Sequence, residues 1–271
     1  MIILNTCRKT AYLGCLIALL SACGTMQNGR GWGQDATLTP GWDRVGRAAL
    51  NAMAAPETWA PAAGAAAFQI GHADQRVSDR AMRSNPVYGS RHTADRVSDQ
   101  LLYASGAVWV ISGAAAPSGE GAGEWTLNKI KGFTIEAGGG LAALGLVEIT
   151  KKGTDRERPD HTDRESFPSG HAAGASYFLT LSSRHVDTFG WSPAAVTASR
   201  IGLGTITAAT AWARVEAGQH YPSDVLAGIA VGHFFGAFVT DAFIGADNPL
   251  NALVLFEPAK GGGVAMVRFD F

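Results

Sequence analysis

The spacing of apolar residues predicts a chain built mainly of helices. From Trp42 onward, apolar side chains recur at steps of three and four residues, which is the spacing that lines one face of a helix. Further apolar stretches follow along the chain, and their lengths also suit helices. None of them alternates apolar and polar residues as a half-buried strand does. We therefore expect an all-α bundle of about six helices over residues 41–247, with glycines at the helix contacts. The later apolar stretches are 101–116, 133–150, 171–183, 194–213 and 224–245.

The last part of the chain, residues 248–271, has a different pattern. Two β-like runs, Ala252–Phe256 and Val264–Phe271, flank the glycine-rich residues 260–263. Short runs on either side of such a turn are typical of a hairpin. We expect an accessory β-hairpin here, because one hairpin cannot close a membrane barrel.

The start of the chain predicts an export signal followed by a tether. Arg8 and Lys9 precede the short apolar run Ala11–Leu20, and small residues follow it. This order is typical of a secretory signal peptide, which we assign to residues 1–22. The polar, glycine-rich residues 23–40 are interpreted as a tether.

The end of the apolar run indicates a lipid anchor. Leu20-Ser21-Ala22-Cys23 resembles the lipobox of bacterial lipoproteins, in which the cysteine is lipidated and becomes the first residue after cleavage. All three cysteines lie within residues 1–23, so the folded part has no disulfide framework. Gly24, where sorting signals for the inner membrane carry aspartate, favours the outer membrane by the same resemblance. We expect an exported protein at the periplasmic face of the envelope, held to the membrane through Cys23; release, or an uncleaved N-terminal helix, is the alternative.

Charge and hydropathy narrow the function classes. The net charge of −1 gives no support to nucleic-acid binding, which usually needs a basic face. Glu136 and Glu148 interrupt one apolar stretch and Asp224 and Asp241 another, and charges near a bilayer centre are costly. The mean hydropathy of +0.06 is low for a chain made mostly of spanning helices. A bundle on a lipid tether is the favoured interpretation, and an integral membrane bundle stays open.

Residues 72–100 form a charged region with two similar phrases, 73–79 (ADQRVSD) and 94–99 (ADRVSD). They are too short to establish a repeat. Serine and aspartate are common helix caps, so we interpret the region as loops and helix starts.

The first motif that carries chemistry is a pair of cations. Lys151 and Arg158 are seven residues apart, so on a helix both could face one side. A point charge and a planar guanidinium suit the oxygens of a phosphate. By themselves, however, such pairs at a helix end are usually solvated or complement the helix dipole.

The second motif is Pro168-Ser169-Gly170-His171, which precedes a helical run. Ser169 is a natural cap, and the free N–H groups of a helix start favour an anion. His171 would lie beside a bound phosphate and could protonate a leaving oxygen. A plain helix start with a surface histidine is the alternative.

The third motif contains Arg214, His220 and Asp224. Asp224, in the first turn of a helix, could accept a hydrogen bond from one imidazole nitrogen of His220. That would fix the tautomer and leave the other nitrogen free to attack phosphorus. Asp224 could instead only complement the helix dipole.

Together, the three motifs resemble the signature of the type 2 phosphatidic acid phosphatase superfamily. They read Lys-x6-Arg-Pro, Pro-Ser-Gly-His and Arg-x5-His-x3-Asp, in that order. The superfamily includes bacterial class A acid phosphatases, lipid phosphatases and vanadium haloperoxidases. Two features depart from its pattern: Ala213 stands where a serine is usual, and only eight residues separate Pro159 from Pro168, which bears on the pocket mouth.

The resemblance implies an all-helical bundle with the site at one end and a role for each residue. His220 would be the nucleophile that forms a phosphohistidine, oriented by Asp224, and His171 would protonate the leaving group. The implied activity is hydrolysis of phosphomonoesters or lipid phosphates without a metal or cofactor. The phosphoryl oxygens would be held by Lys151, Arg158, Arg214, Ser169 and the amide of Gly170.

Three other interpretations stay open at this point. The first is a metal-dependent hydrolase, because acids crowd the link between the first two motifs and hard cations prefer several carboxylate oxygens. The arginines interleaved with these acids would, however, repel a metal. The residues that suit phosphate would also bind vanadate in a haloperoxidase. A non-enzymatic envelope lipoprotein would carry a vestigial site, but every site residue is present. The groups that could hold a metal are Asp155, Asp160, His161 and Asp163.

Overall fold

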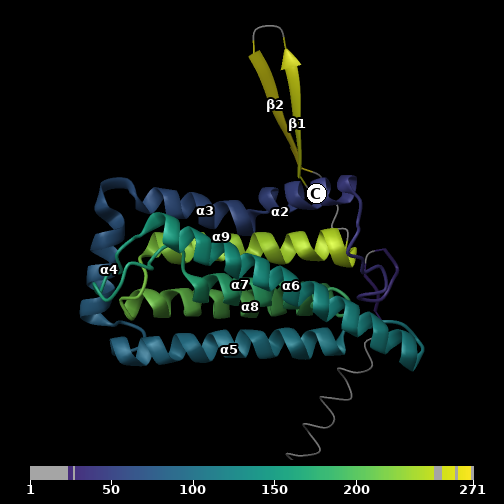
Figure 1. Cartoon of the computed structure of the whole chain (residues 1–271), viewed down its shortest axis with the longest axis horizontal. Coiled ribbons are helices and arrows are strands. Elements are labelled where there is room, and N and C mark those ends of the chain that lie inside the picture. Colours follow the sequence, from purple (N-terminus) through teal and green to yellow (C-terminus); the bar gives the residue numbers. More distant parts are fainter. Residues whose placement is uncertain (1–23, 27, 247–251, 260–261, 270–271) are drawn as a thin grey trace, which may run out of the picture.

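The structure is a computed structural model that describes residues 24–26, 28–246, 252–259 and 262–269. In these ranges, eight α-helices form a bundle in which most helices run along the long axis and α4 stands across one end (Figure 1). The predicted signal peptide and Cys23 lie outside the described residues. In chain order the helices are α2 (Trp42–Ala54), α3 (Pro56–Phe68), α4 (Ala73–Ser84), α5 (Arg91–Ala115), α6 (Ala122–Thr154), α7 (Gly170–Val186), α8 (Pro193–Glu216) and α9 (Pro222–Val239).

The prediction of an all-helical bundle is confirmed for this part of the chain, but the number of about six helices was too low. Pro56 begins a new helix, so the first helical stretch is divided into α2 and α3. The charged region also forms a complete helix, α4, and the start of α5, where we expected loops and helix starts. The residues that α4 buries are Asp74, Ser78 and Ala81, and a mostly polar inner face leaves no apolar periodicity to detect.

Helix α7 is the centre of the bundle and packs against α5, α6, α8 and α9. Its contact with α9 is close because α9 presents glycines to it. A Cβ atom added to Gly232 would lie 2.8 Å from Ser176 Cβ and 2.9 Å from Tyr177 N, and closer still to the carbonyl oxygen of Ala173. Gly228, one turn earlier, is also close to the start of α7: a Cβ atom added there would lie 2.5 Å from the carbonyl oxygen of Ser169. The glycines therefore set the separation between the two helices that carry the second and third motifs.

The segment before α2, which the sequence predicts to be a tether, packs against the bundle through residues that the structure describes. Trp32 is only 1% exposed, and Met26 is also buried, in an apolar cluster at the end of the bundle away from the three motifs. The indole of Trp32 fills the space beside Gly132, where a Cβ atom would collide with the ring. A large aromatic side chain gains enough from burial to dock a segment whose composition otherwise suggests a linker.

Glu136 organises a buried polar centre next to Trp32. Its carboxylate accepts hydrogen bonds from Trp32 Nε1 at 3.2 Å, Trp109 Nε1 at 2.6 Å and His185 Nε2 at 3.0 Å. Burying a carboxylate is costly unless such partners satisfy it. This centre joins the N-terminal segment to α5, α6 and α7.

Two helical segments are long and apolar enough to cross a membrane, by length and composition alone. They are Ala122–Thr154 and Pro222–Ile244, the latter including a π-helical turn, Thr240–Ile244, after α9. The second segment is the more enclosed by the rest of the bundle. At the end of the chain, β1 (Ala252–Ala259) and β2 (Gly262–Phe269) pair as antiparallel strands.

Candidate active site

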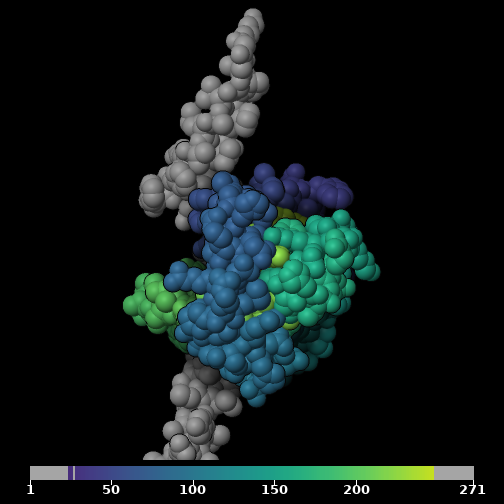
Figure 2. Space-filling model, turned by 90° about the vertical axis from the view of Figure 1, so that its left-hand side faces the viewer, coloured from purple at the N-terminus to yellow at the C-terminus, as the bar shows by residue number. Residues whose placement is uncertain are grey.

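The three motifs meet at one end of the bundle. Lys151 lies in the last turn of α6, Arg214 in the last turn of α8, and α7 and α9 begin at this end. Figure 2 views the end on which the site lies: α4, in blue, crosses it, and the teal end of α6 with the link that follows lies beside α4. Segments up to 73 residues apart, from Lys151 to Asp224, are thus brought together as the spacing predicts.

His220 is buried and held as a neutral imidazole. Its Nδ1 atom lies 2.6 Å from the carbonyl oxygen of Ser166, and a carbonyl can only accept, so Nδ1 carries the proton. Burial lowers the pKa of His220 well below its usual range, and the positive charges of Arg214, Arg158 and Lys151 lower it further. The Nε2 lone pair is therefore available, which is what a nucleophilic histidine needs.

Asp224 does not make the hydrogen bond to His220 that we expected. Its carboxylate lies 3.9 Å from His220 Nδ1, beyond hydrogen-bond range. It accepts instead from Ser166 Oγ at 2.5 Å, from Tyr221 N at 2.8 Å and from Arg156 at 2.5 Å. Asp224 is thus linked to the imidazole through Ser166: its carboxylate accepts from the Ser166 hydroxyl, and the Ser166 carbonyl accepts from His220 Nδ1.

The surroundings of Asp224 have opposite effects on the pKa of its carboxyl group. Its pKa is raised to about 6, because burial raises it by more than Arg156 and the hydrogen bond from Ser166 lower it. Arg156 in turn pairs with Asp74 of α4 at 2.8 Å, and the ring of Tyr221 lies 4.2 Å from the guanidinium carbon. The carboxylate is therefore part of a network that ties α4 and the link to the start of α9.

Each of the three predicted phosphate-binding cations is paired with a carboxylate. The amide oxygen of Gln219 accepts hydrogen bonds from both Arg158 and Arg214, so it lies between the two guanidinium groups. Because both guanidinium groups donate to the same oxygen atom, the two arginine side chains converge on one position. The ion pairs are Lys151 with Glu148 at 3.0 Å, Arg158 with Asp163 at 2.6 Å and Arg214 with Asp95 at 2.6 Å.

The start of α7 has the geometry expected for an anion site. Ser169 is the N-cap, and its hydroxyl oxygen accepts from the amide of Ala172 at 3.4 Å. Its own amide donates to the carbonyl of Asp224 at 3.0 Å, which joins the starts of α7 and α9. A Cβ atom added to Gly170 would lie 4.0 Å from Lys151 Nζ, so the ammonium group faces this turn. Free N–H groups and a cation converge here.

His171 lies on the same turn and is held from α5. Its Nε2 atom lies 2.8 Å from Asp99 Oδ1. Burial lowers the pKa of His171, as does Arg214, while Asp99 and Asp95 raise it. The imidazole is thus placed between a guanidinium and two carboxylates.

Sequence reasoning missed the groups that support the motifs. Asp74 and Asp95 each occupy the second position of the two similar charged phrases, and each pairs with an arginine of the site. Asp99 closes the second phrase. The similarity of the phrases was the available signal, since both place an aspartate on an inward helix face at this end. Nothing in the sequence marks Ser166 as the partner of His220.

The acids of the link between the first two motifs form ion pairs rather than a metal cluster. Within the described ranges, no three His, Cys, Asp or Glu side chains gather as metal ligands would. Arginines of the link pair with Asp155 and Asp163, as their interleaving suggests, whereas Asp160 pairs with an arginine of α5. The pairs are Asp155 with Arg164 at 2.7 Å, Asp160 with Arg91 at 3.3 Å and Asp163 with Arg158 at 2.6 Å.

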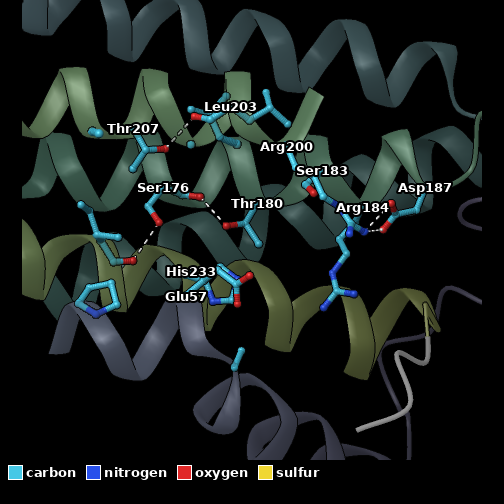
Figure 3. Close-up of a pocket in the computed structure, with 16 residues that line it drawn as sticks. Glu57, Ser176, Thr180, Ser183, Arg184, Asp187, Arg200, Leu203, Thr207 and His233 are labelled. Atoms are coloured by element: carbon cyan, nitrogen blue, oxygen red, sulfur yellow. Dashed lines mark hydrogen bonds and ion pairs between the residues drawn. The ribbon is translucent and has the colours of Figure 1, made fainter. Parts of the chain in front are cut away.

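A separate cavity of about 440 Å³ opens on the flank of the bundle between α3, α7, α8 and α9. Figure 3 shows His233 and Glu57 close together at one side of it, with Arg184 reaching across. His233 Nδ1 lies 2.7 Å from Thr58 Oγ1, and burial lowers the pKa of His233 to about 4. None of the residues of the three motifs lines this cavity, so its lining does not bear on their chemistry.

Comparison with known proteins supports the resemblance. Residues 135–245 match the family model described as the PAP2 superfamily. This segment contains every candidate site residue of the three motifs and covers less than half of the chain.

Two curated relatives and one solved structure are similar to parts of the chain. A lipid A 1-phosphatase of Porphyromonas gingivalis is 37% identical over 98 residues, which are 36% of this chain and 21% of the relative. A lipid A 1-phosphatase of Rhizobium johnstonii is 35% identical over 104 residues, 36% of this chain and 42% of the relative. The chain thus spans less than half of the length of either relative. A transmembrane PAP2 type phosphatidylglycerolphosphate phosphatase from Bacillus subtilis is 22% identical, with a TM-score of 0.49 over 65% of this chain and 88% of that one.

Proposed function

We propose that this chain is a PAP2-type phosphatase that hydrolyses phosphomonoesters or lipid phosphates through a phosphohistidine, without a metal. The observation that carries the proposal is the state of His220. It is a buried, neutral imidazole whose proton is fixed on Nδ1, and three cations surround it. A histidine kept neutral by burial and by neighbouring positive charge is suited to attack a bound phosphate, whose negative charge those cations would hold.

The first step transfers the phosphoryl group to the protein. His220 Nε2 attacks phosphorus, the bond to the leaving oxygen breaks, and that oxygen takes a proton from the His171 imidazolium. Lys151, Arg158 and Arg214 stabilise the negative charge that spreads over the phosphoryl oxygens in the transition state. The carbonyl of Ser166 accepts the Nδ1–H as His220 becomes positively charged, and Asp224 holds Ser166 in place.

The second step returns the enzyme to its starting state. Water attacks the phosphohistidine, neutral His171 takes the proton from that water, and the phosphorus–nitrogen bond breaks. Inorganic phosphate leaves, and His220 is neutral again with its proton on Nδ1. His171 has been acid in the first step and base in the second, which its place beside the phosphate site allows.

Lipid phosphates are the substrate class that we propose first. Two relatives are named as lipid A 1-phosphatases, and the outer face of α6 exposes Ile130, Leu141 and Ile149, at 59%, 72% and 71%. Exposed apolar residues along one helix favour contact with lipid or detergent over contact with water. We further propose that the protein acts at the cell envelope, anchored through Cys23.

The test uses the full chain purified in detergent micelles. Phosphate release is measured from p-nitrophenyl phosphate, phosphatidate and lipid A, with and without a strong chelator. We expect hydrolysis that survives the chelator and is lost in His220→Ala. His92→Ala, which removes an exposed histidine of α5 at the same end, should keep full activity.

Trapping the intermediate separates this mechanism from others. Enzyme mixed with ³²P-labelled substrate and quenched in alkali should carry label that is released by acid, as a phosphohistidine would be, and His220→Ala should carry none. Full hydrolysis by His220→Ala would refute the proposal. Halide oxidation by vanadate-treated protein, without phosphate release from any of the three substrates, would favour the haloperoxidase instead.

A further inference from the structure

Helix α5 contributes a pair of acids to the site, although it lies outside all three motifs. Ala94 and Ser98 are fully buried, so this face of α5 packs against the bundle at the end where the site lies. Asp95 and Asp99 are four residues apart and therefore share a helix face. Asp95 pairs with Arg214 at 2.6 Å, and Asp99 with His171 at 2.8 Å.

The contact made by Asp99 is specific to its place in the second charged phrase. Asp79 ends the first phrase, as Asp99 ends the second. Its carboxylate accepts a hydrogen bond from Gln75 on its own helix at 2.9 Å, an exposed contact. The two aspartates thus match in sequence context, but only one is bonded to a histidine of the site.

We propose that Asp99 is a positioning residue that orients His171 as the general acid of the reaction. The inference rests on the proposed function and deepens it. The Asp99 carboxylate accepts the Nε2–H of the imidazolium, so the Nδ1–H is the proton available to the leaving oxygen. After that proton has gone, Nε2 keeps its own, and the neutral tautomer is ready to take a proton from water on Nδ1.

Asp99 also supports the charge that His171 must carry. From α8, Arg214 disfavours the imidazolium, and Lys151 of α6 faces the adjacent Gly170. From α5, Asp99 and Asp95 favour it. Asp95 is already paired with Arg214, so Asp99 is the carboxylate in direct contact with the imidazole. Without it, burial and the cations would leave His171 deprotonated over more of the pH range.

The decisive experiment varies the leaving group. An alkyl phosphate leaves as a basic alkoxide and needs the proton, whereas 2,4-dinitrophenyl phosphate leaves readily without one. In Asp99→Asn we expect kcat/KM on the alkyl phosphate to fall by about 10-fold or more, since general acid catalysis contributes about 10²- to 10⁴-fold. On the dinitrophenyl ester the loss in kcat/KM should be within about 2-fold, because kcat/KM reports the step in which the leaving group departs and little acid catalysis is available to lose there.

Two further readouts separate positioning from a general loss of structure. The alkaline limb of the pH profile should move to lower pH in Asp99→Asn, and Asp99→Glu should restore part of the loss. Asp79→Asn is the matched control and should behave as wild type with both esters. His171→Gln should show the same leaving-group dependence as Asp99→Asn, and the double variant should lose little more than His171→Gln alone.

The outcomes are distinct. A loss in Asp99→Asn that is equal for both esters, or no loss with either, would overturn the role of Asp99 while leaving the phosphatase intact. Absence of hydrolysis by wild-type protein with any phosphate ester would overturn the proposed function, and the role of Asp99 with it. A leaving-group-dependent loss in Asp99→Asn but not in Asp79→Asn supports the proposal.

Discussion

Replacing Gly232 by alanine tests whether the contact between α7 and α9 sets the geometry of the site. The added Cβ would lie 2.8 Å from Ser176 Cβ and 2.9 Å from Tyr177 N, and it would overlap the carbonyl oxygen of Ala173. Two of these three neighbours are backbone atoms, so a side-chain rotation cannot relieve the overlap. The helices must move apart at this level.

The expected cost follows from two opposing effects. Overpacking a well-packed contact costs about 1–3 kcal/mol. Alanine is favoured over glycine in a helix by about 1 kcal/mol, which offsets part of the cost. Because backbone must move, we take the overpacking cost at the upper end of its range, about 3 kcal/mol. After the offset, Gly232→Ala should lower the free energy of unfolding by about 2 kcal/mol. Ala173 lies two residues after His171, so the same movement shifts His171, the proposed acid, relative to His220. Misplacement by about 1 Å can cost about 10²-fold in rate.

The assay pairs this variant with a control. Gly202 of α8 is exposed, and a Cβ atom added there meets nothing within 4 Å. Gly202→Ala should therefore raise the free energy of unfolding slightly, by up to about 1 kcal/mol, and leave the rate unchanged. Thermal unfolding and phosphate release are measured for both. If Gly232→Ala unfolds at the wild-type temperature and keeps the wild-type rate, the close approach of α7 and α9 does not control the site.

Three other results are expected. The proposed mechanism needs neutral His220, whose pKa is well below its usual range, and protonated His171, whose pKa is also lowered. On that mechanism kcat/KM should fall as pH rises through the lower-than-usual pKa of His171, and its maximum should lie below pH ~6.5. A maximum above pH ~8 would contradict these roles. Trp32→Ala should lower the free energy of unfolding by about 3–5 kcal/mol, because it removes a buried aromatic side chain. Trp32→Phe keeps a ring but loses the N–H that donates to Glu136, and it should cost less. Urea denaturation measures both costs, and equal costs would contradict this account. Cys23→Ser should abolish incorporation of labelled fatty acid in cells, and labelling that persists would place the lipid elsewhere.

The helices were predictable because apolar spacing is a local property of the sequence. The three motifs were predictable because their residue types occur at fixed spacings and in a fixed order. Apolar spacing reveals a helix wherever its buried face is apolar, and α4 escaped prediction because Asp74 and Ser78 form part of its buried face. The motifs identified the cations and histidines by type and spacing. They did not identify the partner of His220, since a backbone carbonyl such as that of Ser166 leaves no residue-type signal.

The supporting acids were not predictable for a different reason. Asp99 and His171 are 72 residues apart, and Asp95 and Arg214 are 119 apart, so their contacts depend on how α5 packs beside α7 and α8. An aspartate on a charged helix is usually solvated, and only the tertiary arrangement distinguishes one that holds a histidine. Trp32 escaped for the same reason, because the composition around it describes a linker and its docking site is on α6.

The docked N-terminal segment changes what a lipid anchor at Cys23 would do. Gly24 lies against Thr188 and Gly190, just beyond the last turn of α7, while His171 lies in the first turn of the same helix. The 17 residues of α7 span about 25 Å, at about 1.5 Å per residue. A lipid at Cys23 would therefore attach the protein near one end of α7, with the site at the other end of that helix and no flexible linker between them. An upright molecule would reach phosphates presented roughly that far from its own membrane attachment, and one lying along the membrane would reach those in the same surface.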